Sequence, residues 1–121
     1  MSSECSLPRF AIFVRSDQQG AYRVAVTEDL NTGAGTAQID DMTWDPGSGC
    51  LSANTLAQAS HTPDTNWHTY RVEVHDNYIK LLIDGTQVVE ATDNHHLTGA
   101  ATGLWSYHAV LNVRSFKVIA L

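Results

Sequence analysis

The chain has 121 residues, a length that suits one domain with a single core. Hydrophobic residues make up 43% of it and charged residues 17%, and no apolar run is as long as a membrane span. Thirteen acidic residues against seven basic ones give a formal net charge of −6, which disfavours binding to nucleic acid and to anionic membranes.

The start of the chain shows no basic segment followed by an apolar one, as a secretory signal would have. We therefore expect a cytoplasmic protein, or a secreted one whose leader has been removed. Cys5 and Cys50 match no metal or redox motif, and we expect two reduced thiols rather than a disulfide. A single domain over residues 1–121 is expected, with residues 1–6 mobile.

The first predicted elements are two paired strands. Residues 7–14 are a dense apolar run, which is typical of a strand buried on both faces. A polar turn with a glycine follows at 16–20, and apolar residues then alternate with polar or small ones over 22–26. This pattern predicts that the second strand pairs with the first across the turn.

Two weaker strands are expected next, at 37–43 and 51–59. Proline and glycine in the segment 44–49 indicate a turn between them. Because residues 51–60 are rich in Ala, Leu and Gln, a short helix is the alternative there.

The clearest pattern predicts a β-hairpin. Apolar and polar residues alternate over 70–75 and again over 78–83, so each strand has one apolar face. Asp76 and Asn77 between them tolerate the positive φ of a tight turn. A second turn is expected at Asp84-Gly85.

Three further strands are expected at 86–91, 101–107 and 110–119, which are rich in β-branched and aromatic residues. Eight or nine short strands at even spacing, with no long helix, predict an all-β fold. The expected architecture is a two-sheet antiparallel sandwich.

Three groups of segments, in this order, resemble the concanavalin A-like lectin/glucanase family, in particular its laminin-G-like and sugar-hydrolase-associated branches. They are FAIFVRSD at 10–17 with GAYRV at 20–24, WHTYRVEV at 67–74 through IDG at 83–85, and LTG at 97–99 with TGLW at 102–105 and FKV at 116–118. The resemblance covers most of residues 10–119. It implies a concanavalin-like jelly roll in a short version.

The resemblance also implies a carbohydrate site on the concave sheet face or on the rim loops. Aromatic rings stack on sugars in such sites, and charged or amide groups bind hydroxyls. Trp44 is the best candidate platform, because it precedes a turn and loops carry function; for Trp67, core or edge packing is the default. The candidate ligand-binding residues are Trp44, Arg23, Arg71, His75, Trp105 and Tyr107.

Catalysis of the family's usual kind is not expected. Catalytic glucanases of this architecture resemble one another in a Glu-x-Asp-x-x-Glu strand, and none of the glutamates here lies in that pattern. We therefore expect a non-catalytic binding module for carbohydrate or another small polar ligand. One alternative is a hydrolase acting on sugar derivatives, marked by convergent His and Asp or Glu side chains with shifted pKa in one pocket. The other is a protein-interaction module that uses an exposed sheet edge.

No resident cofactor is expected. The six histidines show no zinc spacing, and His95 and His96 would point to opposite sides of an extended strand. Calcium is the ion that the resemblance implies, and Asp40, Asp41 and Asp45 are its candidate loop ligands. Because the sandwich is short, we expect an exposed edge strand and a homodimer formed through it.

Overall fold

The computed structural model describes residues 10–28, 35–45, 47, 50–62, 66–106 and 115. Within these residues it contains eight strands and no helix, and so no helix that is long and apolar enough to cross a membrane. The strands are β1 (Phe10–Ser16), β2 (Gly20–Glu28), β3 (Gly35–Asp45), β4 (Cys50–Ser60), β5 (Tyr70–His75), β6 (Tyr78–Ile83), β7 (Thr86–Thr92) and β8 (Ala101–Ser106).

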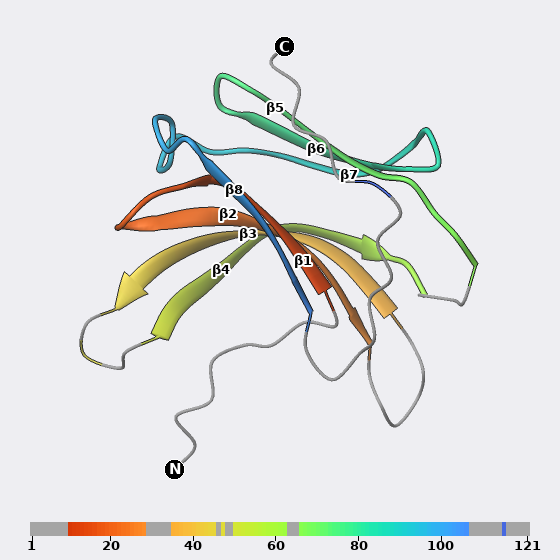
Figure 1. The fold of residues 1–121 in the computed structure, drawn as a ribbon, viewed down its shortest axis with the longest axis horizontal. Helices are drawn as coiled ribbons and strands as arrows, with labels where there is room; N and C mark the ends of the chain where they lie inside the picture. Colours follow the sequence, from red (N-terminus) through yellow and green to blue (C-terminus); the bar gives the residue numbers. More distant parts are fainter. Residues whose placement is uncertain are drawn as a thin grey trace.

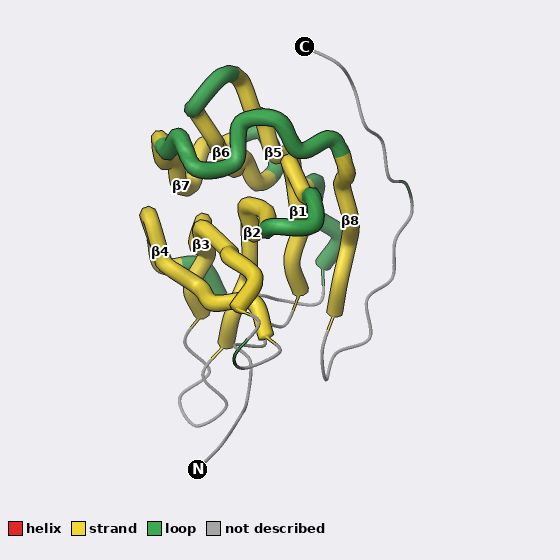
Figure 2. The backbone as a smooth tube through the Cα atoms, turned by 90° about the vertical axis from the view of Figure 1, so that its left-hand side faces the viewer, coloured by secondary structure: helices red, strands yellow, loops and turns green. Residues whose placement is uncertain are grey.

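The strands form two layers, with β5, β6 and β7 lying over the larger sheet (Figure 1). The larger sheet has the order β4-β3-β2-β1-β8, and the smaller one has the order β5-β6-β7. All pairs are antiparallel, and β8 returns from the smaller layer to pair with β1. Figure 2 shows the same two layers from the side. The expected all-β, two-sheet antiparallel sandwich is confirmed.

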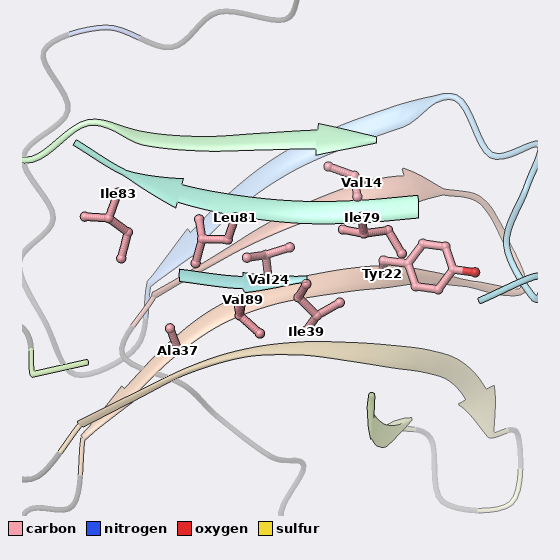
Figure 3. Close-up of a cluster of buried hydrophobic side chains, with 9 residues drawn as sticks. All are labelled: Val14, Tyr22, Val24, Ala37, Ile39, Ile79, Leu81, Ile83 and Val89. Carbon is pink, nitrogen blue, oxygen red and sulfur yellow. The ribbon is translucent and has the colours of Figure 1, made fainter. Parts of the chain in front are cut away.

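The core lies between the two layers. Alternation along β2 and β6 gives each strand one apolar face, and these faces meet. Removing this apolar surface from water is the main stabilising contribution, at about 25 cal/mol per Å². Figure 3 shows the nine buried side chains of the cluster, which are Val14, Tyr22, Val24, Ala37, Ile39, Ile79, Leu81, Ile83 and Val89.

The predicted hairpin forms as β5 and β6, with Val72 opposite Leu81. Asp76 in its turn adopts a φ of 51°, as the sequence predicts. Asp84 and Gly85 adopt φ values of 52° and 84° in the next turn. A tight two-residue hairpin needs a positive φ of this kind at both central positions.

The two weaker predicted strands are also present, as β3 and β4. They pair from Thr36 opposite Ser60 to Asp45 opposite Cys50. The helical alternative for residues 51–60 is wrong, because the ladder to β3 satisfies this backbone as a strand. The predicted strand at 110–119 and the two cysteine side chains lie outside the described residues.

Candidate functional site

Two neighbouring carboxylates on β3 point to opposite faces of the larger sheet. Asp40 lies opposite Arg23 in the register with β2, on the face away from the smaller sheet. Asp41 lies opposite Tyr22, on the inner face. This follows from the two-residue period of a strand. The two carboxylates therefore lie in two different environments.

The Asp40 carboxylate is part of a buried ion pair. Arg23 donates to it from Nε at 2.9 Å and from Nη2 at 2.8 Å, and both side chains are at most 2% exposed. Gln38 and Thr55 donate to the same carboxylate, at 2.9 Å and 2.8 Å. Hydrogen bonds from three side chains compensate the buried charge, which is typical of a structural ion pair.

The Asp41 carboxylate lies between two imidazoles from the loop after β7. Its Oδ1 is 2.6 Å from Nε2 of His96, and its Oδ2 is 2.8 Å from Nδ1 of His95. The two rings are stacked, with their centroids 4.5 Å apart and an interplanar angle of 28°. His96 is buried, whereas the His95 side chain is 54% exposed. We call Asp41, His95 and His96 the Asp-His-His cluster.

Tyr22 fixes the backbone of this loop. Its hydroxyl donates to Asp93 Oδ2 at 2.8 Å and accepts the His96 backbone N–H at 3.0 Å. The same Asp93 oxygen accepts the His95 backbone N–H at 3.1 Å. Burial, as the largest cause, raises the pKa of Tyr22 to about 12, so the hydroxyl keeps its proton at neutral pH.

A glycine allows the His96 ring to lie against β2. A Cβ atom at Gly20 would lie 2.0 Å from the Met42 carbonyl oxygen and 2.6 Å from Cε1 of His96. Neither neighbour could stay where it is if position 20 carried a side chain. The close approach of β2, β3 and the loop thus depends on this one residue.

Arg15 ties the same loop to the rest of the sandwich. It adopts a φ of 50° where the pairing of β1 with β8 changes register. Its Nη1 donates to the backbone oxygen of Leu97 at 3.2 Å and to that of Asp76. The loop after β7 is therefore held from two directions, by Tyr22 and by Arg15.

A shallow hollow of about 300 Å³ opens beside the cluster. We call it the Trp44 hollow; it is lined by Gln18, Gln19, Thr43, Trp44, His95 and His96. Trp44 is 48% exposed, and its backbone N–H donates to the Gln19 carbonyl oxygen at 2.9 Å.

The contact between Asp41 and His95 also affects the charge of the exposed ring. The hydrogen bond to Asp41, as the largest cause, raises the pKa of His95 above its ordinary value.

The structure places the sequence-predicted site residues on three separate surfaces. Trp44 lies in the hollow, and Arg23 is buried with Asp40 on the outer face of the larger sheet. Arg71 and His75 are exposed on β5, where Arg71 pairs with Glu73 at 3.0 Å. The Trp105 side chain and Tyr107 lie outside the described residues. The predicted residues that are described thus do not form one site.

Sequence reasoning missed the Asp-His-His cluster. Its histidines are 54 and 55 residues from Asp41, and in an extended strand they would diverge. The two signals in the sequence were the adjacent histidines His95-His96 and the adjacent aspartates Asp40-Asp41. No pattern in the sequence indicated that these two pairs lie in contact. Of the predicted calcium ligands, Asp40 and Asp41 point to opposite faces, and the Asp45 side chain lies outside the described residues.

The chain is similar in architecture to a solved carbohydrate-binding module, CBM66 from Bacillus subtilis. The two are 17% identical with a TM-score of 0.55, over 85% of this chain and 66% of that one. This likeness shows the β-sandwich fold. No curated protein matches the sequence. The chain belongs to the family described as the 3-keto-alpha-glucoside-1,2-lyase-like domain, whose model matches residues 11–112.

Proposed function

We propose that the Trp44 hollow binds a sugar unit. The observation that carries this proposal is a half-exposed tryptophan beside two imidazoles, in a hollow of about 300 Å³. An indole face stacks on the C–H face of a sugar ring, and ring nitrogens bind hydroxyls. The names of the family and of the solved neighbour support a sugar ligand, since one mentions a glucoside and the other carbohydrate binding.

Of the two locations expected from the sequence, the rim is favoured over the concave face. The inner face of the larger sheet packs its apolar side chains against β6 and β7, which leaves that area to the core. The hollow instead lies where the turn before β2, the end of β3 and the loop after β7 come together. Loops at a rim adapt to a ligand without disturbing the sandwich.

An array of glycans and 3-keto-glucosides tests the proposal. Replacing Trp44 with alanine should weaken binding at least about tenfold, the equivalent of about 1.4 kcal/mol. Trp67→Ala is the matched control, because Trp67 is 59% exposed, precedes β5 and is not one of the residues that line the hollow. It should bind like the unmodified chain. If no sugar binds, or if both variants bind normally, the proposal is wrong.

A second candidate function is elimination on a 3-keto-glucoside, favoured by the geometry of Asp41 and His95. With a proton on Nδ1 directed at Asp41, the exposed ring presents Nε2 as a general base. A ketone at C3 acidifies the C2 proton of such a sugar. Removing that proton forms a C1–C2 double bond as the bond from C1 to the glycosidic oxygen breaks. The leaving oxygen then takes up a proton and departs as an alcohol.

A turnover assay with a methyl 3-keto-α-glucoside tests this candidate. The product is a conjugated enone, so ultraviolet absorbance should rise as methanol is released. His95→Gln should lower the rate by about 10²- to 10⁴-fold, the usual contribution of a general base. His68→Gln is the control, because His68 also contacts one carboxylate, that of Asp84, at 2.6 Å. Turnover that His95→Gln leaves unchanged, or no turnover at all, would reject the elimination.

A further inference from the structure

The two carboxylates on β3 differ in how their charge is compensated. Asp40 has the guanidinium of Arg23 at 2.8 Å. Asp41 is also buried, yet its side-chain partners among the described residues are the two imidazoles. The Arg23 guanidinium keeps its proton and its charge, whereas an imidazole can give up a proton to a metal ion. The Asp41 carboxylate therefore faces two ring nitrogens that can bind a cation together with it.

The donor atoms around Asp41 indicate which cation fits. One ring nitrogen from each of His95 and His96 and a carboxylate oxygen of Asp41 all lie within 4.8 Å of one another. Imidazole nitrogens with one carboxylate suit zinc, nickel, cobalt or iron, whereas calcium takes oxygen ligands. Three protein ligands leave further coordination positions for a small ligand, as in catalytic zinc sites.

We propose that the Asp-His-His cluster is a binding site for a divalent transition-metal ion, with an open coordination position facing the Trp44 hollow. The ion replaces the protons that the two rings now share with the carboxylate, so a metal-bound His95 acts as a ligand and not as the general base of the second candidate function. Because those contacts are 2.6 Å and 2.8 Å, the atoms need to separate only slightly to admit it. Binding releases protons and is therefore weaker at low pH.

One ring must turn for both nitrogens to reach the same ion, because the two rings are stacked. His95 is the ring that has room to turn, with 54% of its side chain exposed. His96 is fixed by its contact with Gly20 and by the Tyr22 hydroxyl on its backbone. Two ligands are thus held by the fold, and the third closes on the ion from the solvent side.

Titration calorimetry with Zn²⁺, Ni²⁺, Co²⁺ and Ca²⁺ on the full chain without an affinity tag tests the proposal. We expect one transition-metal ion per chain and no response to calcium, and bound Co²⁺ should show visible absorption. His95→Gln should weaken binding by more than about 100-fold, since even residues outside the ligand shell contribute about 10- to 100-fold. His68→Gln should bind normally, although it too removes a histidine next to a carboxylate.

A second variant distinguishes loss of metal binding from loss of the fold. Asp41→Asn keeps the shape of the side chain but removes its charge, and should abolish metal binding while circular dichroism stays unchanged. The proposal is wrong if no transition metal binds in a saturable way, or if His68→Gln and His95→Gln weaken binding equally. Because metal binding is read directly, it is independent of whether any sugar binds to the hollow.

Discussion

The single residue on which the larger sheet depends most is Arg23. Its guanidinium and the Asp40 carboxylate are both at most 2% exposed, so removing Arg23 would leave a buried carboxylate without the cation beside it. The sequence alone favoured a ligand-binding role for Arg23, because this residue lies on the polar face of its predicted strand. The burial of that face places Arg23 among the residues that hold β2 to β3.

Replacing Arg23 with methionine should lower the free energy of unfolding by about 3–5 kcal/mol, because it leaves Asp40 buried without its cation. Urea denaturation followed by circular dichroism measures the change. Arg71→Met is the control and should change the stability little, since Arg71 pairs with Glu73 on an exposed face. Equal stability of the two variants would contradict the structural role of the pair.

The contact between Asp41 and His95 should make stability depend on pH. The groups facing His95 are Asp41, Asp93 and the His96 ring. Because the folded pKa of His95 is raised, its stabilisation is complete below the unfolded pKa of about 6.5 and is lost as the pH rises through the folded value. The difference in urea midpoint between the unmodified chain and His95→Gln should shrink on going from about pH 6 to about pH 9. If the difference in urea midpoint stayed the same from about pH 6 to about pH 9, the raised pKa of His95 would be contradicted.

At the scale of elements, strands were more predictable than the loop that forms the site. The hairpin of β5 and β6 could be predicted because its pattern of alternation and its turn residues are local. The loop after β7 is shaped by Tyr22, which lies 71 residues from Asp93 in the sequence. A contact of that kind leaves no local pattern. Trp44 stays a prediction from the sequence, which was possible because a tryptophan before a turn is a local signal.

The packing of β2 against β3 and the loop can be tested at Gly20. Gly20→Ala should lower the free energy of unfolding by about 1–3 kcal/mol, as overpacking does, because the new methyl group overlaps the Met42 carbonyl oxygen. Gly103→Ala on β8 is the matched control, since a Cβ there meets nothing within 4 Å. Thermal unfolding of the two variants gives the comparison. A normal melting temperature for Gly20→Ala would mean that the strands approach less closely than described.

At the scale of the whole molecule, β4 ends the described larger sheet on one side. Four consecutive residues on it, Ser52, Ala53, Asn54 and Thr55, are exposed and uncharged. Edge strands without charge or proline readily pair with another chain. We therefore propose that the homodimer expected from the sequence forms through β4.

Light scattering at increasing protein concentration tests the dimer. The unmodified chain should show twice the mass of one chain, and Ala53→Lys should give a monomer because lysines on edge strands oppose pairing. Thr98→Lys, with the same change in an exposed loop, should stay dimeric. A monomer at every concentration would remove the proposal.

The adjacency of Asp40 and Asp41 limits how this protein can diverge. One step along β3 separates a carboxylate that stabilises the sheet from one that faces the cluster. Inserting or deleting one residue between Gly35 and Asp40 would shift the phase of the strand and exchange the two environments. The number of residues in β3 before Asp40 therefore determines which carboxylate meets Arg23 and which one meets the cluster.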